Sequence, residues 1–226
     1  MEELNMPAIV WDKAGEHFYE TGVDHGVLYV ADDTGKYGKG VAWNGLSSVT
    51  ESPSGAEESP IYADNIKYLS LRSVEQFEGT IEAYTYPDEF GVCDGSADLS
   101  TGIKIGQQKR KKFAFCYRTK KGNDANDEAG YIIHIIYGAT AAPSERQYQT
   151  VNDSPEAMTF SWSITTTPVE VAGYKPTAHV EIDTSKFAED GGAAKLKKIT
   201  DALYGTESGE AKVLLPDEIK TLVEGQ

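Results

Sequence analysis

The chain has 226 residues, and its 36 acidic against 21 basic side chains leave a formal net charge of −15 at pH 7. This length fits one domain, with two small ones as the alternative, and can bury a sizeable core. The acidic balance argues against a basic face that wraps nucleic acid and against docking on an anionic membrane surface. With 10% aromatic residues, the composition is that of a folded chain rather than a disordered one.

Neither a membrane span nor a secretory signal is visible in the sequence. The longest apolar run, Tyr131–Tyr137, contains His134 and is far shorter than the roughly 20 residues of a spanning helix. The N-terminus lacks a positive region followed by a long apolar stretch. Cys93 and Cys116 lack metal or redox spacing, so we expect buried thiols in a reducing compartment.

Alternation of apolar and polar residues, which is typical of half-buried strands, dominates the chain. Eight segments are predicted as strands: Gly26–Ala31, Lys39–Val49, Ile66–Val74, Phe77–Thr85, Phe113–Thr119, Gly130–Tyr137, Met158–Thr167 and Thr177–Asp183. Gly130–Tyr137 is apolar on both faces, so we expect it in the centre of a sheet or covered on both sides. The number of strands predicts a fold dominated by β-structure, a sandwich or barrel.

Helical signals are few and short. Tyr86–Phe90 carries a proline and two acidic residues where a helix would begin, which predicts a short helix. An apolar repeat at helical spacing over Leu196–Leu203 ends at Gly205, and a last turn or two is expected after Pro216. The C-terminus is therefore predicted to be helical.

Three polar segments are expected outside the strands. Residues 1–20 are interpreted as an N-terminal arm, and Gly122–Gly130 as the tip of a hairpin. Residues 50–64 begin with a Ser/Pro/Gly/Glu-rich stretch that cannot form a core, so we expect a functional or mobile loop. The predicted organisation is an arm over 1–20, a β-domain over 21–183 that includes this loop, and a C-terminal helical segment over 184–226 in the same assembly unit.

The sequence offers no credible active site, and we expect neither enzyme activity, a cofactor nor a metal. The pairs Glu16-His17 and Asp24-His25 could sketch a metal site, but their spacing matches no known ligand signature. His134 is interpreted as a hydrogen-bonded core or interface residue. His179 lies on a polar strand face and is expected to be solvated.

Two further patterns imitate binding loops. Asp124, Asn126 and Glu128 resemble a calcium loop, but the sixth position is Ala129 and the twelfth is Ile135 instead of glycine and glutamate. The glycine-rich segment 34–40 lacks the spacing and ending of a phosphate-binding loop. Both are interpreted as turns.

The only strong positive run consists of Lys109, Arg110, Lys111 and Lys112. Three interpretations stay open: contact with nucleic acid, pairing with an acidic surface of a neighbouring subunit, and a plain solvated strand entrance. The net charge of −15 makes pairing between subunits at least as plausible as nucleic-acid contact.

Several longer strings carry a resemblance to a known family. They are GVDHGVLY (22–29), KGVAWNGLSSVTESPSGAE (39–57), YADNIKY (62–68), SVEQFEGTIEAYTYPDEF (73–90), IGQQKRKKFAFCYRT (105–119), GYIIHIIYG (130–138), NDSPEAMTFSWSITTTPV (152–169), LYG (203–205) and LLPDEI (214–219). Together they resemble the major tail protein, or tail tube protein, of long-tailed (siphovirus-type) bacteriophages. The resemblance covers roughly residues 8–222.

The resemblance implies a structural virion protein with a β-sandwich-like fold and a flanking short helix, similar to the tube proteins of contractile injection machines. Six copies would close into a ring, and rings would stack around the tape-measure protein into a tube that joins other tail proteins and later conducts DNA. Such a protein would be assembled in the host cytoplasm and end in the virion tail. The family's inter-ring loop corresponds here to Thr50, Glu51, Ser52, Pro53, Ser54, Gly55, Glu57 and Glu58.

Six copies of a −15 chain would carry −90, and an acidic bore would repel phosphates and let DNA slide. Glu78 and Glu82 share the polar face of a predicted strand, so we expect them to face the lumen, with outside solvent or a neighbouring subunit as the alternative. Two other classes stay open: another virion subunit, such as a tail terminator or capsid decoration, and a carbohydrate-binding β-sandwich module. Exposed Tyr84 and Tyr86 would give the latter weak support.

Overall fold

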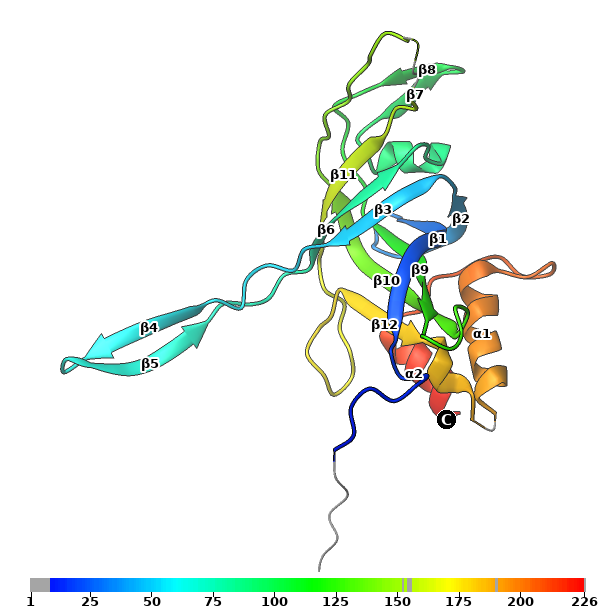
Figure 1. Cartoon of the computed structure of the whole chain (residues 1–226). Coiled ribbons are helices and arrows are strands. Elements are labelled where there is room, and N and C mark those ends of the chain that lie inside the picture. Colours follow the sequence, from blue (N-terminus) through cyan, green and yellow to red (C-terminus); the bar gives the residue numbers. More distant parts are fainter. Residues whose placement is uncertain (1–8, 152, 154–155, 190, 226) are drawn as a thin grey trace, which may run out of the picture.

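The computed structural model describes residues 9–151, 153, 156–189 and 191–225, and β-strands dominate it (Figure 1). In chain order the strands are β1 (Tyr19–Ala31), β2 (Tyr37–Trp43), β3 (Leu46–Glu51), β4 (Glu58–Ala63), β5 (Ile66–Arg72), β6 (Glu78–Ala83), β7 (Ala97–Ser100), β8 (Ile103–Ile105), β9 (Phe113–Gly122), β10 (Gly130–Ala141), β11 (Phe160–Thr165) and β12 (His179–Asp183). The helices are the 3₁₀ helices Asp88–Val92 and Thr184–Phe187, α1 (Gly192–Tyr204) and α2 (Pro216–Glu224). The expected β-dominated fold with a short helix and a helical C-terminus is confirmed.

The main sheet has the order β2-β1-β9-β10-β11-β6-β3, with β12 paired to β10. The sheet has two halves, one with β2, β1, β9 and β12 and the other with β11, β6 and β3, and β10 belongs to both. The first part of β10 pairs with β9 and β12, whereas Thr140 and Ala141 pair with β11. The register breaks between Ile136 and Ala139, where the strand turns from one half of the sheet to the other. The sheet therefore folds over itself into a sandwich.

Gly138 sits at this bend with a φ of 59°. A Cβ atom there would lie 2.2 Å from the carbonyl oxygen of Thr167, and only glycine adopts this conformation without strain. The Gly138 carbonyl accepts a hydrogen bond from the Thr167 amide at 3.1 Å, which ties the bend to the segment after β11.

An aromatic core fills the space between the two halves. Trp43 packs edge-on against Phe115 and Trp162, with ring centroids 5.3 and 5.5 Å apart, and Phe90 from the 3₁₀ helix lies 4.5 Å from Trp43. These side chains are completely or almost completely buried. Such edge-to-face contacts add to the apolar area that the core removes from water.

A second core lies on the other face of the β1–β9–β10 half, under the C-terminal helices. Its buried members include Tyr29, Ile133 and Ile135 from the strands and Ile199 and Leu203 from α1. Strand β10 is thus covered on both faces, which confirms the expectation drawn from its continuous apolar pattern. Cys93 and Cys116 are free and buried, as expected.

Strands β4 and β5 form a two-stranded hairpin that projects far from the body; we call residues 52–76 the arm (Figure 1). Its stem continues the β3–β6 pair, because the Ser52 amide donates to the Glu78 carbonyl and Ser54 pairs with Gln76. Asp64 and Asn65 make the tip, and both have positive φ (50° and 62°), as a two-residue type I′ turn requires.

The prediction of a loop over residues 50–64 is therefore wrong. Thr50 and Glu51 belong to β3, and β4 spans Glu58–Ala63, so within this range only residues 52–57, apart from the bridge at Ser54, and Asp64 at the tip lack a strand assignment. The strand predicted over Ile66–Val74 is confirmed as β5, but every residue of β5 is exposed. The polar composition reflects a ribbon that stands in solvent rather than an irregular loop.

The N-terminal segment lies against the β9–β10 turn in its described part. The amides of Gly15 and His17 donate to the Asp124 carboxylate at 3.0 and 3.2 Å. Residues 1–8 of the N-terminal arm that was expected over residues 1–20 lie outside the described residues. Within the described part of the chain, no helix is long and apolar enough to cross a membrane.

Candidate subunit contacts and a histidine–carboxylate cluster

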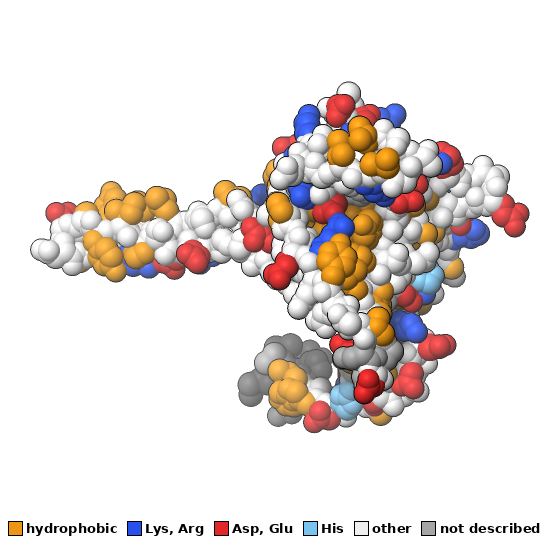
Figure 2. All heavy atoms as spheres, turned by 90° about the horizontal axis from the view of Figure 1, so that it is seen from above, with side chains coloured by type: hydrophobic (Ala, Val, Ile, Leu, Met, Phe, Trp, Pro, Cys, Tyr) orange, Lys and Arg blue, Asp and Glu red, His pale blue; other side chains and the backbone are white. Residues whose placement is uncertain are grey.

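The arm exposes an unusual number of large apolar side chains for its size. Figure 2 shows them on both edges of the projecting ribbon. Tyr62, Ile66 and Tyr68 are each about two-thirds exposed (68%, 64% and 68%). The remaining exposed members are Ile61, Leu69, Leu71 and Val74. Exposed apolar surface of this extent is typical of interaction sites.

Polar side chains cover the outer face of the β3–β6–β11 layer. Residues Gly79, Ile81 and Ala83 of β6 are buried, so Glu78 and Glu82 point to the opposite face, as the sequence predicted. The Ser48 hydroxyl donates a hydrogen bond to Glu82 at 2.8 Å. The register places hydroxyl side chains beside the two glutamates: Ser48, Thr50, Thr80, Ser161, Ser163 and Thr165. This hydroxyl-and-carboxylate layer is called the polar face below.

The basic run at 109–112 is mostly engaged within its own chain. The Arg110 guanidinium donates to the Ala141 carbonyl at 3.1 Å and lies 3.6 Å from Asp94. Lys112 donates to the Thr167 hydroxyl at 2.9 Å, and the Lys111 ammonium lies 4.0 Å from Asp33. The partners of Arg110 are thus intramolecular, and Lys109 is exposed. A role of this run between subunits stays a prediction.

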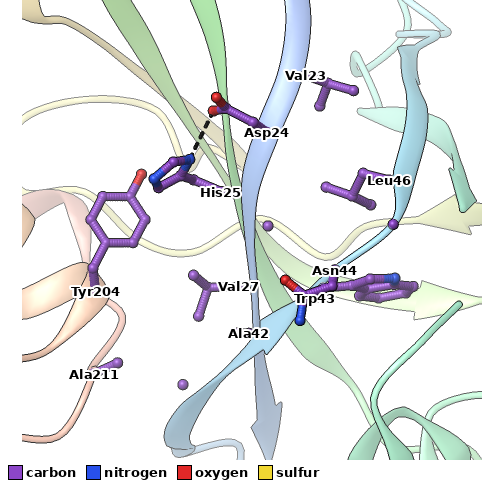
Figure 3. Close-up of a pocket in the computed structure, with 13 residues that line it drawn as sticks. Val23, Asp24, His25, Val27, Ala42, Trp43, Asn44, Leu46, Tyr204 and Ala211 are labelled. Carbon is purple, nitrogen blue, oxygen red and sulfur yellow. Dashed lines mark ion pairs between the residues drawn. The ribbon is translucent and has the colours of Figure 1, made fainter.

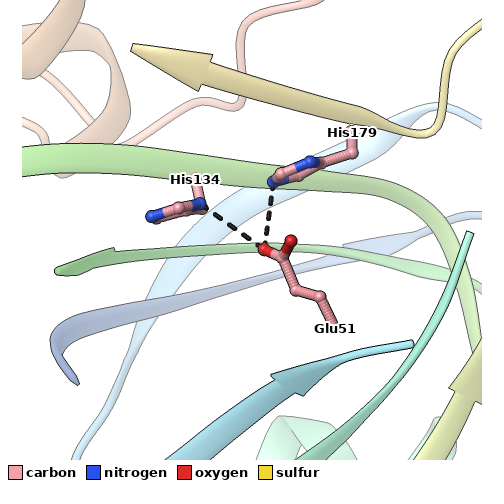
Figure 4. A group of neighbouring side chains, drawn as sticks. All are labelled: Glu51, His134 and His179. Atoms are coloured by element: carbon pink, nitrogen blue, oxygen red, sulfur yellow. Dashed lines mark ion pairs between the residues drawn. The ribbon is translucent and has the colours of Figure 1, made fainter. Parts of the chain in front are cut away.

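Glu51, His134 and His179 converge at one end of the sandwich, from β3, β10 and β12 (Figure 4). Glu51 Oε1 lies 3.5 Å from His134 Nδ1 and 3.3 Å from His179 Nε2. The His134 and His179 side chains are only 8% and 15% exposed, and the Glu51 side chain is 30% exposed. The expectation that His179 is solvated is wrong, whereas the buried position expected for His134 is confirmed.

Neighbouring groups set the protonation of this cluster. His134, together with the Tyr117 hydroxyl that donates to Glu51, lowers the pKa of the Glu51 carboxyl to about 2. Burial lowers the pKa of His179, an effect that the Glu51 charge opposes only in part. At neutral pH the cluster therefore combines a carboxylate with an imidazole that favours its neutral form.

A cleft of about 430 Å³ lies between β1, β2 and the C-terminal segment (Figure 3). Its wall carries His25, which has a positive φ of 52° at an irregularity of β1 and packs edge-on against Tyr204. Asp24 Oδ1 lies 3.1 Å from His25 Nδ1 and is also bound by Arg118. Apolar residues make up much of the rest of the lining, and the cleft is open to solvent.

The pairs Glu16-His17 and Asp24-His25, which were considered as a metal site, do not come together in the structure. His17 contacts Asp12 and Asp124, whereas His25 contacts Asp24. Among the described residues, the only three-residue group with metal-like spacing is Glu51, His134 and His179, which the sequence did not join. His134 and His179 each sit in a predicted strand, but the pairing of β10 with β12 that brings them together depends on the sheet order.

No family model matches this chain, and neither does any curated protein sequence. Among solved structures, the chain is similar to a protein of the sheath–tube complex of an extracellular contractile injection system, PVC, in its extended state. The two share 12% identity over 70% of this chain and 88% of that one, with a TM-score of 0.33. A sheath/tube terminator of the same system gives 13% identity, coverage of 73% and 97%, and a TM-score of 0.31. At these values the likenesses carry no argument about function.

Proposed function

We propose that this chain is a structural subunit of a phage tail tube, in which six copies close into a ring and rings stack around a tape-measure protein into a conduit for DNA. The proposal starts from the resemblance of the sequence strings to tail tube proteins. The β-sandwich with a short flanking helix is the fold that this resemblance implies. Enzyme activity has no part in the proposal, and the chain joins other tail proteins in the virion.

The arm is the observation that carries the proposal. A lone two-stranded hairpin is marginally stable in water, and this one leaves its apolar side chains exposed. A partner that covers Tyr62, Ile66 and Tyr68 would bury this surface and order the ribbon against it. In a stack of identical rings, the body of a subunit in the next ring is the partner that the family resemblance names.

The polar face supports the same assembly. Glu78 and Glu82, surrounded by hydroxyl groups, would give a hydrophilic and negatively charged wall. Such a wall suits a bore through which DNA slides, because it offers phosphates no cation to bind. We therefore assign this face to the lumen in the assembled tube.

The alternative virion roles, tail terminator and decoration protein, differ in the product of self-assembly, since only a tube subunit polymerises on its own. A carbohydrate-binding module is less well supported than the sequence implied. Tyr84 is 54% exposed, but Tyr86 packs against Phe90, Phe160 and Trp162 and is not free to stack on a sugar.

Electron microscopy of the purified chain tests the proposal directly, together with light scattering over a range of concentrations. We expect rings or tubes in the wild type. Removing the arm cleanly is possible, because Gly55 and Val74 face each other across the stem and can be joined through two glycines in place of residues 56–73. This variant should stay folded and lose polymerisation.

The hairpin β7–β8 supplies a matched control, because it is a second projecting ribbon whose shortening removes a similar structure (Figure 1). Tubes from the armless variant, or a strictly monomeric wild type at high concentration even after seeding with tail initiators, would refute the tube assignment.

A further inference from the structure

In the Glu51–His134–His179 cluster, two buried ring nitrogens without a hydrogen-bond partner lie beside a carboxylate. The Thr119 hydroxyl donates its proton to Glu20 at 2.8 Å and lies 3.1 Å from His134 Nε2. Since that hydroxyl proton is already used, the hydroxyl can only accept from His134, which places the ring proton on Nε2. Nδ1, which lies 3.5 Å from Glu51 Oε1, is then the nitrogen that remains to bind a cation, either a proton or a metal ion.

If the ring is neutral, its Nδ1 lone pair faces the carboxylate in a buried site, which is unfavourable unless a positive charge, a proton or a metal ion, lies between them. His134 Nδ1 and His179 Nε2 are both buried and have no hydrogen-bond partner. Two buried imidazole nitrogens and one carboxylate oxygen thus lie within 4.8 Å of one another (Figure 4). Imidazole and carboxylate groups are the ligands that zinc uses in His/Glu sites.

The distances fit such an ion. Ligand atoms about 2.1 Å from a tetrahedral zinc stand roughly 3.4 Å apart. The two contacts of Glu51 Oε1 measure 3.5 and 3.3 Å, and all three ligand atoms lie within 4.8 Å of one another. Glu181, whose Oε1 lies 4.0 Å from His134 Nδ1, is placed to supply a fourth ligand.

The surroundings hold these groups in position as a metal site requires. Thr119 fixes the tautomer of His134, which is the usual task of an outer partner of a histidine ligand. Tyr117 stacks on the His134 ring at 4.7 Å and donates to Glu51, and Phe77 stacks on His179 at 4.7 Å. The rings are therefore restrained before any ion arrives.

From this geometry we infer that Glu51, His134 and His179 form a binding site for a divalent transition-metal ion of the zinc type. Glu51 is the last residue of β3, where the arm leaves the body, and the histidines lie in β10 and β12. A bound ion would therefore fasten the root of the arm to the opposite half of the sandwich. The inference does not depend on the proposed function, because it concerns the single chain.

The test uses the untagged full-length chain, stripped with a chelator and titrated with Zn²⁺ in competition with a chromogenic chelator. We expect one Zn²⁺ per chain and a rise in melting temperature on binding, since an ion that binds the folded state alone stabilises it. Glu51→Gln and His179→Asn should each lose more affinity than the roughly 10–100-fold typical of losing an outer partner. Thr119→Val should fall within that range.

His25→Asn is the matched control, because this histidine also pairs with a carboxylate but lies outside the cluster. It should bind Zn²⁺ like the wild type. Circular dichroism without metal checks that each variant is folded, and using two ligand variants keeps the test valid if one is not. Absence of stoichiometric binding, or equal binding by wild type and a folded His179→Asn variant, would overturn the inference.

Discussion

Asp24 and Arg118 form a two-point ion pair across β1 and β9, with Arg118 Nε and Nη2 at 2.5 and 3.1 Å from the two carboxylate oxygens. The side chains are 32% and 22% exposed. The pair lies where the β1–β9 register shifts, between Thr21 and Val27. It therefore links the two strands through side chains at a place where the backbone pairing is irregular. Fork-to-fork geometry of this kind gives stronger hydrogen bonds than a single contact.

Replacing Asp24 with asparagine should lower the free energy of unfolding at pH 7 by about 1 kcal/mol. Burial alone would raise the pKa of Asp24, but the hydrogen bonds and charge of Arg118 outweigh it and hold the pKa below 3.8. A lowered folded-state pKa stabilises the fold above the unfolded-state value, and this contribution is lost as the pH falls through the folded-state pKa. Urea denaturation of both proteins should therefore differ at pH 7 and converge in strong acid.

Asp33→Asn is the control for this pair, because Asp33 is 79% exposed and lies 4.0 Å from its lysine. It should change stability by only a few tenths of a kcal/mol. A stability difference between Asp24→Asn and wild type that persists unchanged at the lowest pH would contradict the assignment.

Gly138→Ala should destabilise the chain by at least about 2 kcal/mol, because it adds left-handed strain to a clash with the Thr167 carbonyl oxygen. Gly173→Ala separates the two effects. Gly173 also has a positive φ, of 80°, but no atom within 4 Å of the position of a new Cβ. It should cost only about 1 kcal/mol. Equal losses for the two variants in chemical denaturation would show that the bend at Gly138 is not tightly packed.

Both cysteines should resist thiol reagents in the native protein. Burial raises the pKa of Cys93 and Cys116 to about 12, so hardly any thiolate is present at pH 8. A chromogenic disulfide reagent should titrate two thiols in guanidinium chloride and react far more slowly without it. Ser47→Cys, at an exposed position of β3, adds one fast thiol as an internal reference. Rapid native reaction of either natural cysteine would mean that its core opens readily.

Exchanging Glu78 and Glu82 for lysine tests the lumen assignment. Tails that carry both substitutions should form but release DNA slowly, because the new cations attract phosphates. Raised salt should relieve the delay by screening. Glu207→Lys with Glu210→Lys makes the same charge change on the exposed turn after α1 and should leave ejection unaffected. Unchanged ejection from normally formed tails of the Glu78/Glu82 variant would place these carboxylates outside the channel.

Much of the β-domain follows from local pattern. Alternation identified β6 with its buried Gly79, Ile81 and Ala83, and the two-sided apolar run identified β10 as covered on both faces. The helix that ends before Gly205 and the helix that starts at Pro216 followed from spacing and capping residues. These features depend on residues close in sequence, whose period of two or 3.6 reveals which face is buried.

The sequence contains a signal for the β4–β5 hairpin of the arm, although a loop was predicted there. Asp64-Asn65 is a pair that tolerates positive φ at both positions, and it lies between Ile61-Tyr62 and Ile66, so it signals a two-residue hairpin. The Ser/Pro/Glu composition of the stem pointed instead to a loop. Composition reports solvent exposure, and an exposed ribbon has the same preference for polar residues as an irregular segment.

The histidine cluster was decided by the tertiary structure alone. Glu51, His134 and His179 are separated by 83 and 45 residues, and they meet because β12 pairs with β10 while β3 closes the other half of the sandwich. The sequence determined that each of these residues lies in or beside a strand. Which strands become neighbours depends on how the whole sheet folds over at Gly138, and this long-range packing leaves no periodic trace in the chain.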